Sequence, residues 1–519
     1  MKKFVFYPLL FSINPILLLL AANISDVPVS QLFPVILITP LVAAGLLWLL
    51  TKWLKDIHRA GFIVFLLTFW FFHYGTVRLW AGSIKIGPVL LGSQWLFFPL
   101  WTFIFVFLMS GYLWRRITSP KTITLFFNLT CVVLVGFSIL RISLDVVPRY
   151  LTRVEVSKAL QSLPDLPSTS SQPDVYYIIL DGYAREDVLR EMYHYDNSAF
   201  INELEDKGFL IARNSQSNYM QTALSVASSL NMDYLSGLST IVPDRGQLMG
   251  MIQHNQAMAI FKHMGYKLVT FDSGYQSTDI TNSDIHLVSP RLGKSHNLEA
   301  LMLINSVASI LIENKWIDVP IPRYSSAQER MKYEFDTLGS EVPNITGPKM
   351  VFAHFITPHP PFIFDQNGPI SSEKFYVLQD GNNFWGTREQ YINNYVEQII
   401  FTNKQVIKVI DGIIANSKSP PIIILQADHG PGAYLDFKSV ENTCLKERFS
   451  IFSAYYLPSG STEENINDLT PVNIFRYIFS SDFKIHYDLL PNKQYYSTWD
   501  LKNSFLDVTE NSQLTCNLP

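Results

Sequence analysis

Residues 423–433, IILQADHGPGA, carry an apolar run directly into an Asp-His pair and a Gly-Pro-Gly turn. A continuous apolar run of this length is typical of a strand that is buried on both faces. Asp428 and His429 therefore stand where the strand ends and the turn begins. A carboxylate and an imidazole at such a point can bind one cation, and these ligand types suit zinc or manganese. The alternative is a turn aspartate that caps backbone amides beside an exposed histidine.

Further strands and helices alternate along the chain from residue 174 onward. The strand candidates are 175–183, 266–275, 350–357, 421–430 and 449–458. Helical patterns lie between or after them at 198–209, 256–266, 388–417 and 470–479, the last beginning with Thr470 and Pro471. This alternation predicts an α/β domain with a mainly parallel central sheet. Ligands of such sheets bind beyond the carboxyl ends of the strands.

Three other candidate residues fall at the same predicted edge. Asp181 closes the first apolar strand, where a buried carboxylate without a partner would cost several kcal/mol. It either caps the following helix or binds metal. His354 lies within or just past the strand at 350–357, and His359 follows it between two prolines. We expect these histidines to orient or protonate a substrate or to complete a second metal site, although a packed core histidine is an alternative for His354.

Thr222 stands at the start of a helix predicted from the apolar positions 223, 224, 227 and 230. It is either an ordinary N-cap threonine or a nucleophile. A hydroxyl at a helix N-terminus meets free amides and the positive end of the helix dipole, which together can hold a phosphate. With a metal beside it, this hydroxyl is a plausible nucleophile.

The first 145 residues hold five apolar segments, each close to the ~20 residues that cross a bilayer. They lie at about 4–22, 32–52, 60–80, 93–114 and 122–145. The first resembles a signal peptide, but it lacks an obvious cleavage site, which favours an uncleaved helix. A buried helical core is the alternative reading of the five segments. Residues 146–172 follow as a helical, then Pro- and Ser-rich, junction before an ectodomain at 173–519.

Basic residues predict the orientation of these segments. They concentrate at alternate connections, namely Lys2 and Lys3, then Lys52, Lys55 and Arg59, then Arg115, Arg116 and Lys121. The positive-inside rule then puts the N-terminus in the cytoplasm and everything after about residue 146 outside. In that oxidising compartment Cys444 and Cys516 can pair, but the sequence leaves the pairing open. The net charge of −4 excludes a generally basic nucleic-acid binder.

Together these residues resemble the alkaline phosphatase and sulfatase superfamily over most of 174–490. Asp181 falls where these enzymes place an acidic ligand, and the "ADHG" segment matches their paired ligands Asp428 and His429. The segment "TALS" resembles the nucleophile segment of lipid A phosphoethanolamine transferases, which implies that Thr222 is a nucleophile and a metal ligand. "PHPPF" resembles the substrate-contacting segment of lipoteichoic acid synthases, which implies that role for His359. Both families also have five N-terminal spans and an external catalytic domain.

The chain departs from these families at several points. Asp181 is followed by Gly, as in phosphodiesterases, whereas the two transferase families use Glu there. The cysteine-rich pattern of the phosphoethanolamine transferases is missing. The chain also has no Cys or Ser followed by x-Pro-x-Arg, so the formylglycine site of true sulfatases is absent.

The resemblance implies a membrane-anchored phosphotransferase that uses a divalent metal, zinc or manganese. Thr222 would attack a phospholipid head group and pass it to a glycan or lipid acceptor in the cell envelope. A phosphodiesterase or phosphatase that uses water as the acceptor is the nearest alternative. A catalytically silent membrane protein that binds a partner is a third.

Overall fold

The computed structural model describes the chain in segments. These are residues 4–24, 27, 29–81, 85–86, 89–109, 120–161, 172–238, 245–292, 298–314, 316–317, 323–372, 376–458, 460–499, 505–511 and 516. The chain forms two compact units. The helical unit comprises Met1–Val147 and His296–Ile321. The second unit comprises Pro148–Ser295 and Pro322–Pro519, and we name it the catalytic unit because it holds the candidate residues of the sequence analysis. Residues 162–171, which hold most of the expected Pro- and Ser-rich linker, lie outside the described residues.

All five apolar segments form helices. They are α1 (Tyr7–Ala22), α2 (Leu32–Leu54), α3 (Ile57–Phe72), α5 (Gln94–Met109) and α7 (Pro120–Gln161), which carries on through the predicted junction helix. By length and composition, α2 and residues 121–144 of α7 can cross a membrane. The other three have 16 residues each. That gives about 24 Å against a hydrocarbon core of about 30 Å, so these three are shorter than expected.

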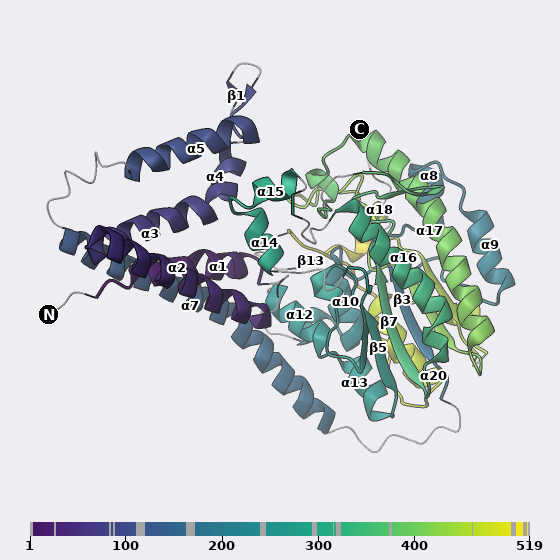
Figure 1. Cartoon of the computed structure of the whole chain (residues 1–519). Coiled ribbons are helices and arrows are strands. Elements are labelled where there is room, and N and C mark those ends of the chain that lie inside the picture. The colour runs from purple at the N-terminus through teal and green to yellow at the C-terminus, as the bar shows by residue number, and fades with distance from the viewer. Residues whose placement is uncertain are drawn as a thin grey trace. The chain divides into compact units, whose positions relative to one another are not determined.

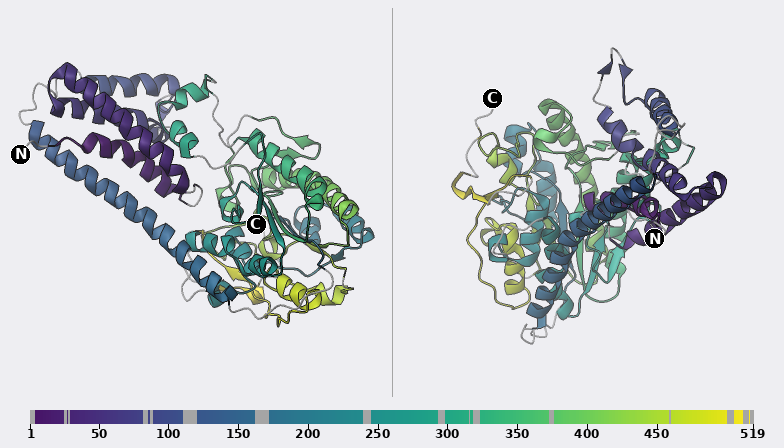
Figure 2. Two further views of the ribbon diagram at one scale, coloured as in Figure 1. Left: turned by 60° about the horizontal axis from the view of Figure 1, so that its bottom comes forward. Right: turned by 90° about the vertical axis from the view of Figure 1, so that its left-hand side faces the viewer.

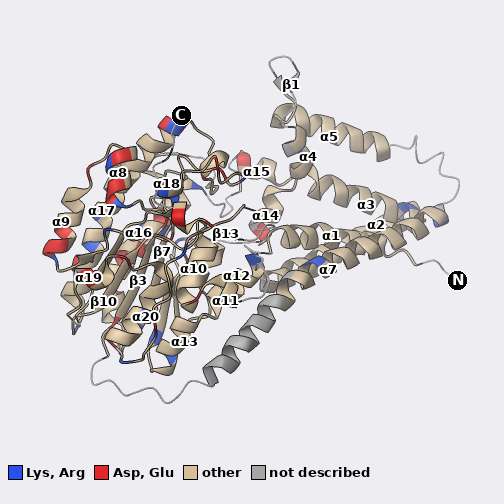
Figure 3. Cartoon of the chain, turned by 180° about the vertical axis from the view of Figure 1, so that it is seen from behind, with Lys and Arg blue, Asp and Glu red and all other residues tan. Residues whose placement is uncertain are grey.

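The helical unit has the surface of a membrane protein. On α2 and α5 large apolar side chains face outward, among them Leu41, Trp53 and Phe103, each at least 66% exposed. Figure 3 shows few charged residues along these helices, while charges are frequent over the catalytic unit. The span expected at 60–80 is divided at His73 into α3 and the short α4 (Tyr74–Ala81). The unit also contains α14 (Leu298–Ile304), α15 (Ser309–Glu313), a hairpin of β1 (Lys85–Ile86) and β2 (Val89–Leu90), and the 3₁₀ turn Val29–Gln31.

A seven-stranded sheet forms the centre of the catalytic unit, in the order β4-β11-β10-β3-β7-β5-β6. Its strands are β3 (Val175–Leu180), β4 (Leu210–Ile211), β5 (Lys267–Phe271), β6 (Ile285–Leu287), β7 (Lys349–Phe355), β10 (Ile422–Gln426) and β11 (Ser453–Tyr456). The five strands from β10 to β6 pair in parallel, and β11 pairs antiparallel with both of its neighbours. The predicted α/β domain with a mainly parallel sheet is therefore confirmed.

Helices cover both faces of this sheet (Figure 1). One face packs against α8 (Glu186–Met192), α9 (Ser198–Asp206), α16 (Tyr324–Ser340) and α17 (Arg388–Asn416). The other packs against α10 (Thr222–Asn231), α12 (Arg245–Gln253), α13 (Gln256–His263) and α20 (Pro471–Ser481). Figure 2 shows the same layers from two further directions. Side chains of β3 alternate between the two cores, which explains why its sequence is apolar without interruption.

Short elements complete the unit. They are α11 (Leu235–Leu238), α18 (Leu445–Phe449), α19 (Glu463–Ile466), the hairpins β8 (Phe364–Asp365) with β9 (Gly368–Pro369) and β12 (Tyr495–Tyr496) with β13 (Leu506–Asp507), and the 3₁₀ turns Gln276–Thr278, Val342–Asn344, Gly381–Asn383 and Thr509–Asn511. Helix α20 begins as expected, with Thr470 at the N-cap and Pro471 at the first helical position. Cys444 and Cys516 form a disulfide with their Cα atoms 5.2 Å apart, which answers the question that the sequence left open.

Candidate active site

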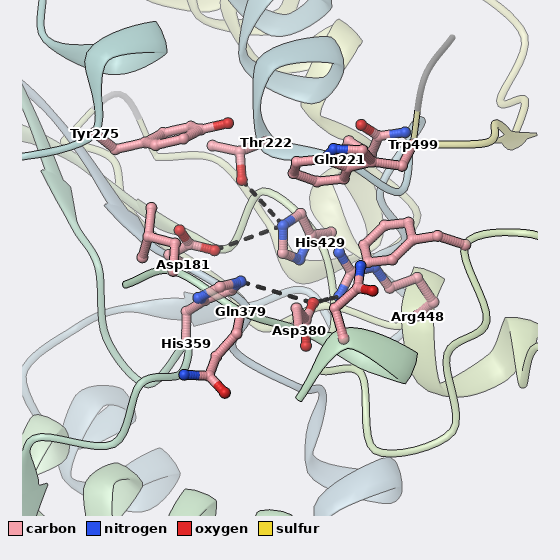
Figure 4. Close-up of a pocket in the computed structure, with 13 residues that line it drawn as sticks. Asp181, Gln221, Thr222, Tyr275, His359, Gln379, Asp380, His429, Arg448 and Trp499 are labelled. Atoms are coloured by element: carbon pink, nitrogen blue, oxygen red, sulfur yellow. Dashed lines mark hydrogen bonds and ion pairs between the residues drawn. The ribbon is translucent and has the colours of Figure 1, made fainter. Parts of the chain in front are cut away.

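The predicted strand ends meet at one edge of the sheet. Asp181 follows β3 directly, and Asp428 and His429 follow β10 after one intervening residue. His354 lies inside β7, opposite Ile179 of β3 in register. Because β10, β3 and β7 are neighbouring parallel strands, their carboxyl ends carry these side chains to one place. Figure 4 shows two of them, Asp181 and His429, side by side.

Asp181, Asp428 and His429 form a compact and fully buried group. One candidate ligand atom from each residue lies within 4.8 Å of the others. His429 Nε2 is 3.5 Å from Asp181 Oδ1 and 3.4 Å from Asp428 Oδ2. Two carboxylates and one imidazole at this spacing are a donor set that suits zinc or manganese.

The unpaired atoms of this group fit a bound cation. Asp181 Oδ1 and Asp428 Oδ2 are buried without a hydrogen-bond partner, although a buried carboxylate oxygen is normally paired. The other oxygen of Asp428 accepts hydrogen bonds from the N–H groups of Gly182 and His429, which fixes the carboxylate. His429 Nδ1 lies 2.9 Å from the Gly430 carbonyl, so Nδ1 carries the proton and Nε2 keeps its lone pair. Burial, together with the nearby Arg448, lowers the pKa of His429 to about 3, which also favours a neutral ligand.

Thr222 faces this group from the start of α10. Gln221 occupies the N-cap position, so Thr222 is the first helical residue and not the cap. Its Oγ1 lies 3.1 Å from His429 Nε2, and the residue is 8% exposed. The first N–H groups of a helix have no acceptor within the helix. The N–H of Leu224 donates to the Gln221 carbonyl. The hydroxyl therefore stands beside the candidate metal ligands and the N–H groups of Thr222 and Ala223, for which the helix supplies no acceptor.

The two predicted histidines lie on the other sides of Asp181. His354 Nε2 is 3.5 Å from Asp181 Oδ2, and its Nδ1 is 2.6 Å from the hydroxyl of Thr278. His359 lies on the loop after β7, where its backbone N–H donates to the backbone carbonyl of Asp181. Burial opposes the charge of His359, but the carboxylates of Asp181 and Asp380 raise its pKa to about 9.

Asp380 and Arg448 belong to the site and were missed by the sequence reasoning. Arg448 Nη1 donates to Asp380 Oδ2 at 2.7 Å, and His359 Nε2 lies 3.6 Å from the same oxygen. Burial alone would raise the pKa of Asp380, yet Arg448 and His359 hold it well below its usual range. Arg448 also donates to the carbonyls of Met220 and Gly430, so it joins the two segments that carry Thr222 and His429.

The Gly-Pro-Gly turn at residues 430–432 allows a close approach of backbones. A Cβ at Gly430 would lie 2.0 Å from the Glu447 carbonyl oxygen, and one at Gly432 would lie 2.4 Å from Asp380 Oδ1. The side chain of Glu447 then accepts hydrogen bonds from the N–H groups of Ala433 and Tyr434 beyond the turn. The turn thus brings His429 close to Arg448 and Asp380, and side chains at positions 430 and 432 would prevent this approach.

A cavity of ≈ 100 Å³ opens onto these residues. Its lining combines the chemical groups described above with a less polar wall. The wall includes Tyr275, Leu378, Phe437 and Trp499, and the polar lining includes Asp181, Thr222, His359, Asp380, His429 and Arg448, together with Gln221, Gln379 and Asn383. Figure 4 shows Thr222, His429 and Asp181 converging on one side, with His359 and Asp380 facing them.

Solved structures are similar to parts of the chain at low sequence identity. The C-terminal periplasmic domain of EcEptC from Escherichia coli has a TM-score of 0.44 and 12% identity, covering 67% of this chain and 96% of that one. The lipooligosaccharide phosphoethanolamine transferase A of Neisseria meningitidis, an integral membrane protein, has a TM-score of 0.39 and 10% identity over 84% and 92%. The phosphonate monoester hydrolase of Agrobacterium radiobacter has a TM-score of 0.37 and 12% identity over 59% and 73%.

No curated protein matches the chain. The family model described as Sulfatase matches residues 173–511, which is most of the chain. Because this match covers more than half of the chain, the chain belongs to the sulfatase family.

Proposed function

We propose that this protein is a membrane-anchored, metal-dependent phosphotransferase that acts through a phosphothreonine at Thr222. One observation carries the proposal. The Thr222 hydroxyl lies 3.1 Å from His429 Nε2, at a helix start, beside two buried carboxylates whose oxygens lack partners. A threonine whose role is only to start a helix does not need a buried imidazole and two buried carboxylates beside its hydroxyl. A divalent cation held by Asp181, Asp428, His429 and Thr222 would lower the pKa of the hydroxyl and polarise the phosphoryl oxygens.

The residues of the chain divide the chemistry between them. Thr222 Oγ1 loses its proton to water and attacks the phosphorus of a phosphodiester, and the bond from phosphorus to the leaving oxygen breaks. The free N–H groups at the start of α10 hold a phosphoryl oxygen during this step. His359, kept protonated by Asp181 and Asp380, donates its proton to the leaving oxygen. An acceptor hydroxyl then gives its proton to His359 and attacks the same phosphorus, and the bond from phosphorus to Thr222 Oγ1 breaks. Thr222 regains its proton from water.

Asp380 and Arg448 position these groups. Arg448 ties the carbonyls of Met220 and Gly430 together, and Asp380 fixes His359 from the opposite side. His354 orients Asp181 through its Nε2 while Thr278 holds its Nδ1. A group held by packing on several sides loses little freedom when it reacts.

The membrane anchor supports a lipid donor and a glycan or lipid acceptor in the cell envelope. A catalytic domain tied to a bilayer meets membrane lipids at high effective concentration. Lys52, Lys55 and Arg59 mark one end of the α2–α3 pair as cytoplasmic, which supports an extracytoplasmic location for the catalytic domain across the inner membrane.

The test uses the full-length protein in vesicles with a phospholipid labelled in its head group. Mass spectrometry should find the labelled phosphoryl group on Thr222, and adding an acceptor glycan should discharge it onto that glycan. An adduct that is lost only to water would favour the phosphodiesterase. No adduct with full turnover would refute the covalent step.

A further inference from the structure

One segment of the catalytic chain belongs to the helical unit. Residues 298–317 lie between β6 and α16 in the sequence, and both of these elements belong to the catalytic unit. The segment itself forms α14 and α15 and packs among the apolar helices. Each of its connections to the catalytic unit leaves only five residues undescribed, 293–297 and 318–322. The chain thus leaves the catalytic unit, contributes this insertion to the helical unit and then returns to the catalytic unit.

Backbone hydrogen bonds join the insertion to the end of α3 and the start of α4. The N–H of Gly75 donates to the Asn305 carbonyl at 2.9 Å, and the N–H of Val307 donates to the Phe71 carbonyl at 2.9 Å. A Cβ at Gly75 would lie 2.6 Å from the Asn305 carbonyl oxygen, so only glycine permits this approach. The contact is therefore a specific fit between two backbones.

A bidentate salt bridge joins α4 to α15 beside the same contact. Arg78 Nη1 and Nη2 donate to Glu313 Oε1 and Oε2 at 2.5 and 3.0 Å. Arg78 Nε also donates to the Gly92 carbonyl at 3.0 Å. A bidentate arginine–carboxylate pair fixes orientation more strongly than a single contact.

At its other end, the insertion is anchored to α1 and α2. The N–H of Leu298 donates to Gln31 Oε1 at 2.8 Å. The fully buried Leu298 side chain packs in a cluster with Leu20, Val27 and Val35. These contacts involve the end of α1, the start of α2 and the end of α3, which lie at the same end of antiparallel helices. Lys52, Lys55 and Arg59 mark the opposite end.

The surface beside this contact has the composition of a membrane interface. Trp316 follows α15 and is 74% exposed, and Trp95 at the start of α5 is 82% exposed. After Trp95, α5 exposes Leu100 and Phe103, so the apolar surface of α5 continues up to Trp95. Tryptophan is enriched where hydrocarbon meets lipid head groups.

We propose that residues 298–317 are a membrane dock, a segment that packs on the outward ends of the membrane helices and contacts the lipid head-group layer through Trp316. The occupant of this surface is the bilayer itself. The dock does not depend on the reaction at Thr222.

The test measures the depth of a spin label in the full-length protein in lipid nanodiscs. The label is attached to Trp316→Cys in a Cys131→Ser background, because Cys444 and Cys516 are already bonded. Trp385→Cys is the matched control, since Trp385 is 77% exposed on the catalytic unit. The label at 316 should collide preferentially with oxygen, as in lipid, and the label at 385 with a water-soluble nickel chelate. Equal nickel accessibility at both positions would overturn the proposal.

A second comparison tests the seating. Gly75→Leu should move the label at 316 toward water, whereas Gly45→Leu should not, because a Cβ at Gly45 meets nothing within 4 Å. If Gly75→Leu fails to assemble, Arg78→Gln removes the paired bridge to Glu313 and the hydrogen bond to the Gly92 carbonyl but leaves the glycine contact in place, and it should cause a smaller shift in the same direction. An unchanged depth in the assembled Gly75→Leu protein, or in Arg78→Gln where that is the variant that assembles, would overturn the seating.

Discussion

Replacing Thr222 by alanine separates a helix residue from a nucleophile. The structure sets the cost in stability. The change removes one hydrogen bond to His429, worth about 0.5–1.5 kcal/mol, and about 0.8 kcal/mol of methyl burial. Alanine restores up to about 0.7 kcal/mol of helix propensity. Because Gln221 holds the cap position, no further capping energy is lost. We expect a net destabilisation of about 1 kcal/mol, which shifts the melting temperature by about 2–4 °C.

The expected loss of activity is far larger. Deleting a nucleophile removes the chemical step, and in enzymes that act through one the turnover falls by up to about 10⁶-fold. Thr222→Ser should keep part of the activity, since it offers a hydroxyl at the same helix start. Ser225→Ala is the matched control. Ser225 is also buried in α10, one turn further along, and its loss should leave turnover nearly intact.

The assay is the initial rate of head-group release from labelled phospholipid vesicles at saturating zinc or manganese. Melting is followed on the same preparations. An alanine variant at position 222 that retains most of the wild-type rate would refute the reasoning. So would equal losses in the Thr222 and Ser225 variants, because that pattern would indicate a damaged helix instead of a missing nucleophile.

Other changes test other parts of the site and the topology. Asp428→Asn should weaken metal binding by at least about 10-fold with the fold retained, measured by metal titration, whereas His354→Gln should slow turnover and leave the metal in place. Burial raises the pKa of Glu447 from its usual value near 4.5 to about 7. The folded state therefore favours the protonated carboxyl, and the stability that this provides is fully present below pH 4.5. It is lost, by up to about 3 kcal/mol, as the pH rises toward 7. Glu447→Gln should flatten this fall in a series of melting curves. A reporter fused after residue 118 should be cytoplasmic and one fused after residue 165 external; the same side for both would contradict the topology.

The sheet and its ligand-bearing edge were predictable because their signals are local. Apolar runs such as that of β10 read as buried strands wherever they occur, and the residue after the run must emerge at the sheet edge. Asp181, Asp428 and His429 each follow such a run, so their convergence needed no knowledge of the rest of the chain. Thr222 was found in the same way, from the start of a helical pattern.

Asp380 and Arg448 have no comparable signal. Asp380 lies in a loop just before a 3₁₀ turn, and Arg448 lies in the five-residue helix α18. Neither position follows a periodic run, and their pairing spans 68 residues of sequence. The glycines of the turn offered a partial clue. A Gly-Pro-Gly sequence implies that another backbone or side chain comes very close, although it cannot say which one.

The membership of residues 298–317 in the helical unit could not be predicted, because their apolar pattern also fits an ordinary helix of the α/β domain. A short apolar helix within an α/β domain normally covers the sheet, and nothing local distinguishes Leu298 from a core leucine. Its partners, Gln31 and Gly75, lie more than 200 residues earlier in the chain. Apolar residues are interchangeable in water-soluble cores and in membrane contacts, so composition alone cannot assign such a helix. What does assign it is the glycine approach and the Arg78–Glu313 bridge, which are complementary features of two surfaces that meet only in the folded chain.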